Sequence, residues 1–234
     1  MAEIKGLEKF SSKDFPGHIS STVFVGGCNF RCPFCHNADL VLKPETLETM
    51  PMDFFLSYLD GRRDWLEGIC LSGGEPLLHE DIETLIRVIK DRNLLVKIDT
   101  NGSFPARLEN IVEAGLVDQA ALDVKAPPEK YARTVRAAAD PGDMARSAAV
   151  LRSSGLPFVF RTTYVPGLLG REDMLRIGEW LGGPGVFQLQ AFVPRNTLDP
   201  AFLDVRPFPR EEMLFAAEML RSFFPEVRIE GVES

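Results

Sequence analysis

Three cysteines in one short loop are the feature of this sequence that most limits its possible folds and functions. Cys28, Cys32 and Cys35 stand in the segment Cys-Asn-Phe-Arg-Cys-Pro-Phe-Cys, and the chain has one further cysteine, Cys70. Thiolates at this spacing can hold three irons of a cubane iron–sulfur cluster. Because the loop supplies no fourth ligand at comparable spacing, one iron would stay open to bind a small molecule and pass it an electron.

Zinc is the alternative occupant of this loop. Three thiolates complete a tetrahedral zinc site when a fourth ligand joins them, and the candidates are His36, His18 and Cys70. The loop by itself does not distinguish zinc from an iron–sulfur cluster, so the choice between them rests on a second motif.

That second motif is the turn Gly73-Gly74-Glu75-Pro76, which follows the apolar run 68–71 and precedes a helical pattern. Paired glycines at a strand end expose backbone N–H and C=O groups to a ligand, and Glu75 adds a carboxylate. The alternative is an ordinary turn between a strand and a helix.

Together the two motifs resemble the radical S-adenosylmethionine (SAM) superfamily. The resemblance assigns Cys28, Cys32 and Cys35 to the cluster loop. Phe34 matches the position that lies against the adenine, and Gly73, Gly74 and Glu75 match the motif that meets the methionine amine. It implies one [4Fe-4S] cluster, because the chain has no cysteines left for more. The bound SAM would be cleaved reductively to a 5′-deoxyadenosyl radical.

More of the chain resembles one branch of that superfamily, the glycyl-radical-enzyme activases, which include pyruvate formate-lyase activating enzymes. The resemblance runs from about Gly6 to Pro225, and Asn196–Pro200 is similar to activators of anaerobic ribonucleotide reductase. The matching segments are 14–17, 26–30, 35–37, 99–102, 122–125 and 165–167.

The branch implies a glycyl radical enzyme as protein substrate and a flavodoxin or ferredoxin as electron donor. Asp14 would meet the glycine-bearing loop of the partner; the alternative is a plain N-terminal turn. Two other functions stay open: a radical SAM enzyme acting on a small molecule, similar to deazaguanine synthases, and a non-catalytic iron–sulfur or zinc module.

Charged side chains end two of the expected strands. Asp99 and Asp123 would share one rim of a parallel sheet, and Lys125 can supply their counter-charge. The resemblance implies that Asp99, Thr100 and Asp123 hold Na⁺ or K⁺, and an oxygen-only shell suits such a cation.

Five more polar side chains are candidates for SAM binding. Arg161 lies in an apolar strand, so it is either a structural ion pair or a ligand for SAM or substrate. Asn101 belongs to a segment that matches the branch, and Asn37, Gln188 and Gln190 can bind adenosine or satisfy local backbone. A histidine that reaches SAM in relatives has no counterpart in 191–195.

Strand-like and helix-like segments alternate along the chain, which predicts an α/β fold with a parallel sheet. Six main units indicate a partial (β/α)6 TIM-like barrel, in which loops after the strands build the active site. We expect a single domain over 1–234, divided into an N-terminal segment 1–17, the barrel 18–192, and 193–234 with a loop, a helix and a short strand. The expected strands are 19–25, 68–71, 95–99, 119–123, 158–164, 186–192 and 227–230.

Composition narrows the class of protein further. Lys plus Arg number 26 against 34 Asp plus Glu, for a net charge of −8, which argues against general nucleic-acid binding. The first residues lack the apolar region of a signal peptide, and no segment is long enough to span a membrane. Few cysteines, most of them in one loop, indicate the reducing cytoplasm.

Overall fold

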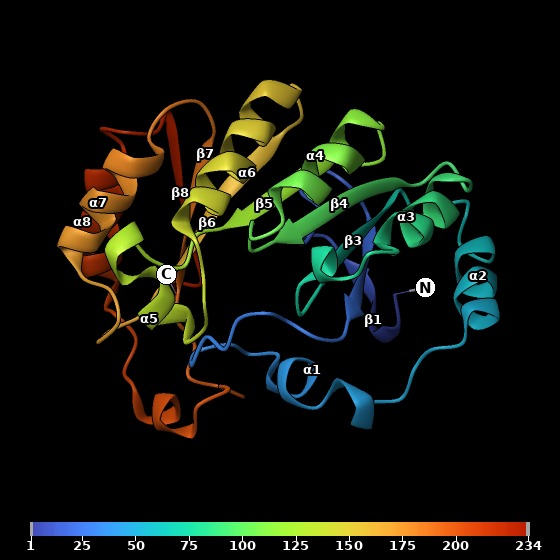
Figure 1. The fold of residues 1–234 in the computed structure, drawn as a ribbon, viewed down its shortest axis with the longest axis horizontal. Helices are drawn as coiled ribbons and strands as arrows, with labels where there is room; N and C mark the ends of the chain where they lie inside the picture. The colour runs from blue at the N-terminus through green and yellow to red at the C-terminus, as the bar shows by residue number, and fades with distance from the viewer. Residues whose placement is uncertain (1, 233–234) are drawn as a thin grey trace.

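The computed structural model describes residues 2–232, and its centre is one eight-stranded sheet whose strands follow each other in chain order (Figure 1). β1 pairs antiparallel with β2, and every later neighbour is parallel. The order makes β1 and β8 the two edges, so the sheet is a partial barrel. The strands are β1 (Ile4–Ser11), β2 (Ser20–Val25), β3 (Gly68–Gly73), β4 (Leu95–Thr100), β5 (Gln119–Asp123), β6 (Phe158–Tyr164), β7 (Val186–Ala191) and β8 (Glu226–Glu230).

Helices cover the outer face of the sheet (Figure 1). In α3, for example, Ile82, Leu85, Ile86 and Ile89 recur at helical spacing and are all buried. The α-helices are α1 (Ala38–Leu42), α2 (Met52–Asp60), α3 (Ile82–Lys90), α4 (Pro105–Glu113), α5 (Tyr131–Val135), α6 (Pro141–Ser154), α7 (Arg171–Leu181) and α8 (Arg210–Leu220). Short 3-10 helices are η1 (Pro44–Thr46), η2 (Pro76–Leu78), η3 (Pro128–Lys130) and η4 (Pro200–Asp204).

The two faces of the sheet differ in chemistry. Alternate residues such as Ile69, Leu71 and Ile98 are fully buried in the apolar core. The residues between them carry polar groups: Cys70 is opposite Lys97 in the β3–β4 register. Because side chains alternate along a strand, this second series faces the inside of the barrel.

The predicted α/β parallel sheet in a partial barrel is confirmed, and each of the six strands from β2 to β7 is followed by a helix, as expected. The expected short final strand is present as β8 and is the seventh parallel strand of the sheet. β1 lies within the segment 1–17 and was not expected as a strand. It is an edge strand whose buried and partly buried residues are consecutive, from Ile4 to Leu7, and are followed by exposed residues from Glu8 to Phe10, so it lacks the alternating pattern of a half-buried strand. Among residues 2–232 no helix has the length and apolarity needed to cross a membrane.

Candidate active site

A cavity of about 180 Å³ opens at the carboxyl ends of the parallel strands, beside the loop that follows β2. Except for Asp14, Gln188 and Gln190, the predicted site residues line it. These residues are Cys28, Cys32, Phe34, Cys35, Asn37, Gly73, Gly74, Glu75, Asp99, Thr100, Asn101, Asp123, Lys125 and Arg161. Segments up to 133 residues apart in sequence therefore meet in one place, since parallel strands bring their carboxyl ends to one edge.

Main-chain hydrogen bonds hold the cysteine loop from two sides. The Arg31 N–H donates to the carbonyl of Val135, at the end of α5, at 2.8 Å. On the other side the Leu198 N–H donates to the carbonyl of Cys35, and that of Asp199 to Pro33, both at 2.9 Å. The Asn196–Pro200 segment thus packs directly against the loop, a contact that its sequence did not reveal.

The three thiols are free and mostly buried. Burial raises the pKa of Cys28 to about 11 and that of Cys32 to about 12, and it also raises the pKa of Cys35. The positive charge of Lys125 opposes this rise at each thiol. Loading a metal would therefore release protons, as thiolate ligands require.

The paired glycines are needed for close packing against the start of the cysteine loop. A Cβ on Gly74 would lie 1.8 Å from the carbonyl oxygen of Gly27. That same oxygen accepts the Glu75 N–H at 2.8 Å, and the Gly73 carbonyl accepts the Asn37 side chain at 2.9 Å. The turn after β3 and the cysteine loop after β2 consequently form one unit.

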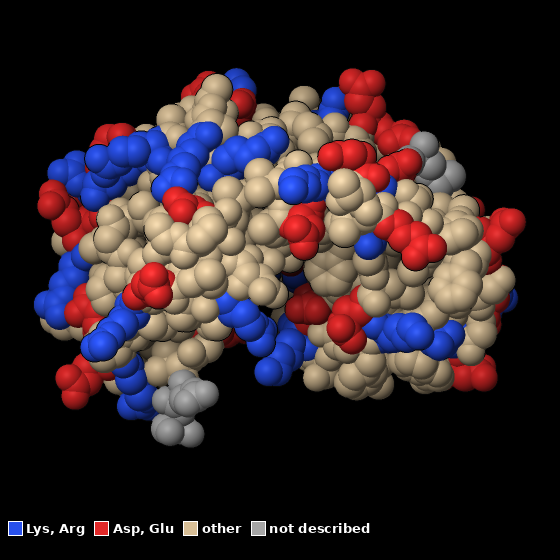
Figure 2. All heavy atoms as spheres, turned by 90° about the horizontal axis from the view of Figure 1, so that it is seen from below, with Lys and Arg blue, Asp and Glu red and all other residues tan. Residues whose placement is uncertain are grey.

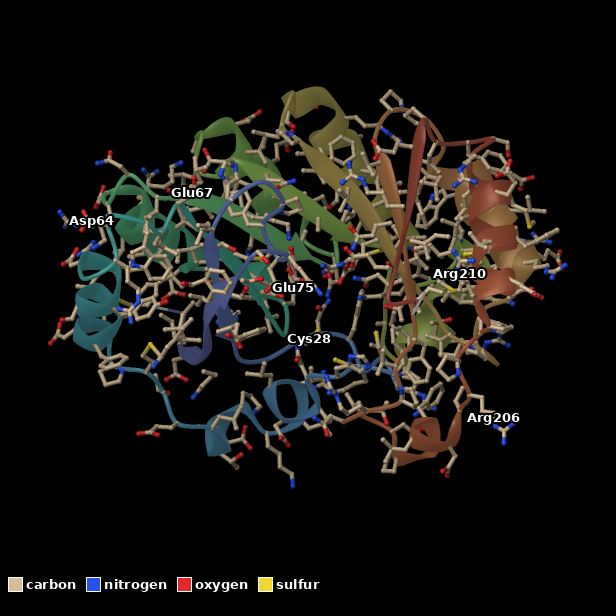
Figure 3. The ribbon with its side chains drawn as sticks, turned by 180° about the vertical axis from the view of Figure 1, so that it is seen from behind. Cys28, Asp64, Glu67, Glu75, Arg206 and Arg210 are labelled. Atoms are coloured by element: carbon tan, nitrogen blue, oxygen red, sulfur yellow. The ribbon has the colours of Figure 1, made fainter. Side chains whose placement is uncertain are left out.

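Glu75 is a buried carboxylate held by neutral donors (Figure 3). It accepts hydrogen bonds from the Thr100 hydroxyl and the Asn101 N–H, each at 2.7 Å, and from the Leu77 N–H at 3.0 Å. Burial raises the pKa of Glu75 to about 7, although these three donors pull it down. A carboxylate without a cationic partner can accept a further N–H from a ligand in the cavity.

Asn101 connects this carboxylate to the cysteine loop. Its side-chain amide donates to the Asn29 side chain at 2.9 Å and approaches the Cys28 sulfur at 3.9 Å. In Figure 3 Glu75 and Cys28 both lie near the middle of the molecule, on neighbouring segments.

Strand-end charges form the opposite wall of the cavity. Arg161 binds Asp123 at 2.6 Å and Asp99 at 3.1 Å, and Lys125 binds Asp123 at 2.8 Å. Burial alone would raise the pKa of Asp123, but Arg161 and Lys125 outweigh it and hold that pKa well below its usual range. Arg161 therefore forms ion pairs, and its role as a ligand for SAM or substrate stays a prediction.

Lys97 is the one member of this charge network that sequence reasoning missed. It is 4 % exposed and forms an ion pair with Asp99. Burial by itself would lower the pKa of Lys97, but the charge and hydrogen bond of Asp99, together with Cys70, outweigh burial and raise that pKa. The available signal was its position two residues before Asp99, which puts both side chains on the same face of a strand.

Several candidates lie away from the cavity. Asp14 precedes β2, at the other end of the barrel, and its carboxylate accepts the Thr22 hydroxyl at 2.6 Å. Of the candidate fourth zinc ligands, His18 lies beside Phe15, and Cys70 faces Lys97 inside the barrel. His36 lines the cavity with its ring 2.7 Å from the carbonyl of Val193. Gln188 and Gln190, on β7, are not among the lining residues.

Comparison with known proteins places the chain among similar sequences and folds. A putative glycyl-radical enzyme activating enzyme of Methanocaldococcus jannaschii is 30 % identical over 221 residues, covering 91 % of this chain and 89 % of that protein. A pyruvate formate-lyase-activating enzyme of Streptococcus mutans is 30 % identical over 206 residues, covering 83 % and 78 %.

Among solved structures, Streptococcus suis SuiB bound to S-adenosylmethionine aligns with a TM-score of 0.66 at 14 % identity, covering 88 % of this chain and 48 % of SuiB. This likeness concerns the fold. The family model of the radical SAM superfamily matches residues 22–181, which include the cysteine loop, the glycine turn and the strand-end charges. This chain therefore belongs to the radical SAM superfamily.

Proposed function

We propose that this enzyme activates a glycyl radical enzyme, by generating a 5′-deoxyadenosyl radical that takes a hydrogen atom from a glycine of the partner. The observation that carries the proposal is the single cavity in which three free thiols meet Glu75 and the strand-end charges. The names of the two relatives, matched over most of both chains, support the choice of a glycyl radical enzyme as substrate.

The residues present fit a [4Fe-4S] cluster and SAM, the cofactors of this superfamily. Cys28, Cys32 and Cys35 would hold three irons, because they are free thiols on one cavity wall. When bound, the reduced cluster supplies the electron that cleaves the C5′–S bond of SAM, and methionine leaves. The positive charge of Lys125 stabilises the thiolates, and the buried walls exclude water.

Other side chains on the cavity wall would position SAM. Glu75 and the backbone of Gly73 and Gly74 would receive the methionine amine. Phe34 is 6 % exposed and offers an apolar surface to the adenine, with Asn37 beside it. Arg161 faces the cavity while bound to both aspartates, so it can present positive charge to a carboxylate of SAM.

A groove beside the cavity supports a macromolecular substrate. Its volume is about 540 Å³, and it shares His36 and Asn37 with the cavity. Lys5 and Phe24 line one part of it, and Asn196 and Thr197 another. Figure 2 shows the molecule from below, with side chains of both charge signs around a hollow in the middle of that face. A partner loop in the groove would contact His36 and Asn37, which directly follow the last cysteine of the loop.

The test begins with anaerobic reconstitution of the full chain with iron and sulfide. After reduction with dithionite, chromatography should show 5′-deoxyadenosine and methionine in equal amounts. The protein is then mixed with candidate partners, an anaerobic ribonucleotide reductase first and a pyruvate formate-lyase second. Electron paramagnetic resonance should show the glycyl doublet with one of them. SAM cleavage without a doublet from any partner would favour the small-molecule alternative.

The finer predictions about partners can be tested in the same assay. Flavodoxin and ferredoxin replace dithionite in turn, and either should support cleavage. The docking role of Asp14 stays a prediction: Asp14→Ala should spare SAM cleavage in the absence of a partner and weaken the doublet. A doublet of full strength from this variant would assign Asp14 to the N-terminal turn alone. We expect the protein to work in the cytoplasm, where such donors are reduced.

A further inference from the structure

Lys97 is a buried ammonium to which the proposed reaction assigns no task. It is the third residue of β4 and faces the inside of the barrel, where its Nζ lies 3.6 Å from the Cys70 sulfur. It does not line the cavity. Its partner Asp99, two residues further along the strand, does line it. Lys97 therefore reaches the cavity only through the Asp99 carboxylate.

The strand-end carboxylates are fully occupied by cations of the protein itself. Oδ1 of Asp99 pairs with Lys97, and its Oδ2 with Arg161 at 3.1 Å. Oδ1 of Asp123 pairs with Arg161 at 2.6 Å, and its Oδ2 with Lys125 at 2.8 Å. The five groups form a row of alternating charge, Lys97–Asp99–Arg161–Asp123–Lys125, with three cations around two anions.

This row does not fit the alkali cation that the family resemblance implies. An ion held by Asp99, Thr100 and Asp123 needs their oxygens to converge on one point. Each carboxylate oxygen instead has a positive partner, and the Thr100 hydroxyl donates to Glu75 at 2.7 Å while accepting the Gly102 N–H at 3.1 Å. A metal cation there would also face three positive side chains.

We propose that Lys97 is a built-in counter-cation that takes the place of an alkali metal ion and positions Asp99 at the cofactor cavity. The consequence for SAM binding rests on the proposed function: affinity for SAM should not depend on Na⁺ or K⁺. A tethered ammonium delivers the same single charge as an alkali ion, and it cannot be lost by dilution.

The first experiment tests Lys97 without cluster or SAM. The metal-free full chain is placed in a choline buffer and titrated with Tl⁺, a probe for potassium sites, with ²⁰⁵Tl nuclear magnetic resonance as the readout. Wild type should show no saturable line broadening, and Lys97→Met should show it, because the variant leaves Oδ1 of Asp99 without a positive partner. Lys97→Arg should behave as wild type. Lys90→Met is the matched control, since Lys90 pairs with Asp118 at 2.8 Å outside the cavity.

The second experiment measures SAM affinity of the reconstituted protein in K⁺, Na⁺ or choline at one ionic strength. Wild-type affinity should agree within about twofold across the three salts. Lys97→Met should bind SAM about tenfold more weakly in choline, as loss of one charge-assisted interaction predicts, and K⁺ should restore most of the affinity.

Saturable Tl⁺ binding by wild type, or a cation effect on its SAM affinity above about threefold, would overturn the proposal. So would a Lys97→Met variant that binds no Tl⁺ and keeps wild-type SAM affinity in choline. If Lys97→Met does not fold, the Tl⁺ titrations of wild type and of Lys97→Arg still test the proposal, because saturable Tl⁺ binding by wild type would overturn it. Should the wild type bind no SAM in any salt, the proposed function fails, while the Tl⁺ result still tests the counter-cation.

Discussion

The two halves of the active site are held in opposite ways. The cysteine loop is fastened by main-chain hydrogen bonds to Val135, Leu198 and Asp199, segments far away in sequence. The strand-end wall is fastened by side-chain ion pairs that run from Lys97 to Lys125. Main-chain hydrogen bonds persist when most side chains are substituted. In a row of ion pairs, by contrast, removing one charge also weakens the pairs formed by its neighbours. Among the side chains of the loop the cysteines should therefore matter most, whereas the wall should depend on every member.

The largest effect should come from the loop cysteines. Replacing Cys28, Cys32 or Cys35 singly by Ala removes a ligand that no nearby side chain replaces, so iron–sulfur absorbance and SAM cleavage should both disappear. Cys70→Ala is the control and should keep both, since Cys70 lies inside the barrel beside Lys97. Cleavage retained by any loop variant would break the assignment of that cysteine.

The second-largest effect should come from a substitution in the strand-end wall, the row of ion pairs from Lys97 to Lys125. Asp123→Asn leaves Arg161 and Lys125 short of a buried negative charge, which typically costs about 3–5 kcal/mol. Denaturant unfolding of the metal-free protein should show this loss near neutral pH. Because the folded pKa of Asp123 is depressed, its stabilisation is present above the unfolded value of about 3.9 and fades as the pH falls below it.

Asp118→Asn serves as the control for Asp123→Asn, because Asp118 pairs with a partly exposed Lys90. Its loss of stability should be smaller. Equal losses in the two variants would contradict the view that the wall behaves as one coupled unit.

Glu75 binds both the Gly27 carbonyl, at the start of the cysteine loop, and Thr100, at the end of β4. Its substitution should have an intermediate effect, on SAM affinity. Glu75→Gln should weaken SAM binding about ten- to hundredfold with the cluster intact, as loss of about 1.5–3 kcal/mol from a charge-assisted hydrogen bond predicts. Calorimetry with the reconstituted protein measures it. Unchanged affinity would remove Glu75 from the SAM site.

Glu75 also predicts a pH dependence of opposite sign to that of Asp123. Its folded pKa of about 7 lies above the unfolded value of about 4.3, so its contribution to stability falls as the pH rises between these values. The stability difference between wild type and Glu75→Gln should follow this slope. A flat difference across pH 4.5–7.5 would show that the Thr100 and Asn101 donors keep the carboxylate ionised.

The smallest loss of stability should come from the segment Leu198–Asp199, which binds the cysteine loop through main-chain hydrogen bonds and is called the clamp below. Asp199 caps η4 through the Ala201 N–H at 3.0 Å and pairs with a half-exposed Arg136 at 2.7 Å. Asp199→Ala should cost about 1 kcal/mol, the usual value of a lost cap, and should also speed bleaching of the cluster in air.

Asp140→Ala is the matched control for this clamp. Asp140 caps α6 through the Gly142 N–H at 2.8 Å and is likewise followed by proline, but it does not touch the loop. Its variant should lose similar stability without faster bleaching. Equal bleaching in both variants would show that the clamp does not protect the cluster.

The sequence by itself determined the class of fold and most of the polar residues that line the cavity. The alternation of apolar strands and amphipathic helices predicts a parallel sheet, and such a sheet gathers its strand ends at one edge. Motifs that follow strands, such as Cys28–Cys35 and Gly73–Glu75, could therefore be assigned to one site before any coordinates. Edge strand β1 was not predicted, because its partly buried residues, Ile4 to Leu7, are consecutive and impose no alternating pattern on the sequence.

Only the tertiary structure decided which charges meet. Lys97, Asp99, Arg161 and Asp123 lie on three strands, and sequence cannot say which oxygen faces which nitrogen. The observed register pairs Asp123 with Arg161, and Lys97 meets Asp99 two residues further along the same strand, so the carboxylates expected to hold a metal ion already have partners. Ion pairing depends on distances of a few ångströms between side chains. Between neighbouring strands, those distances are set by register and twist, which the local sequence pattern does not specify.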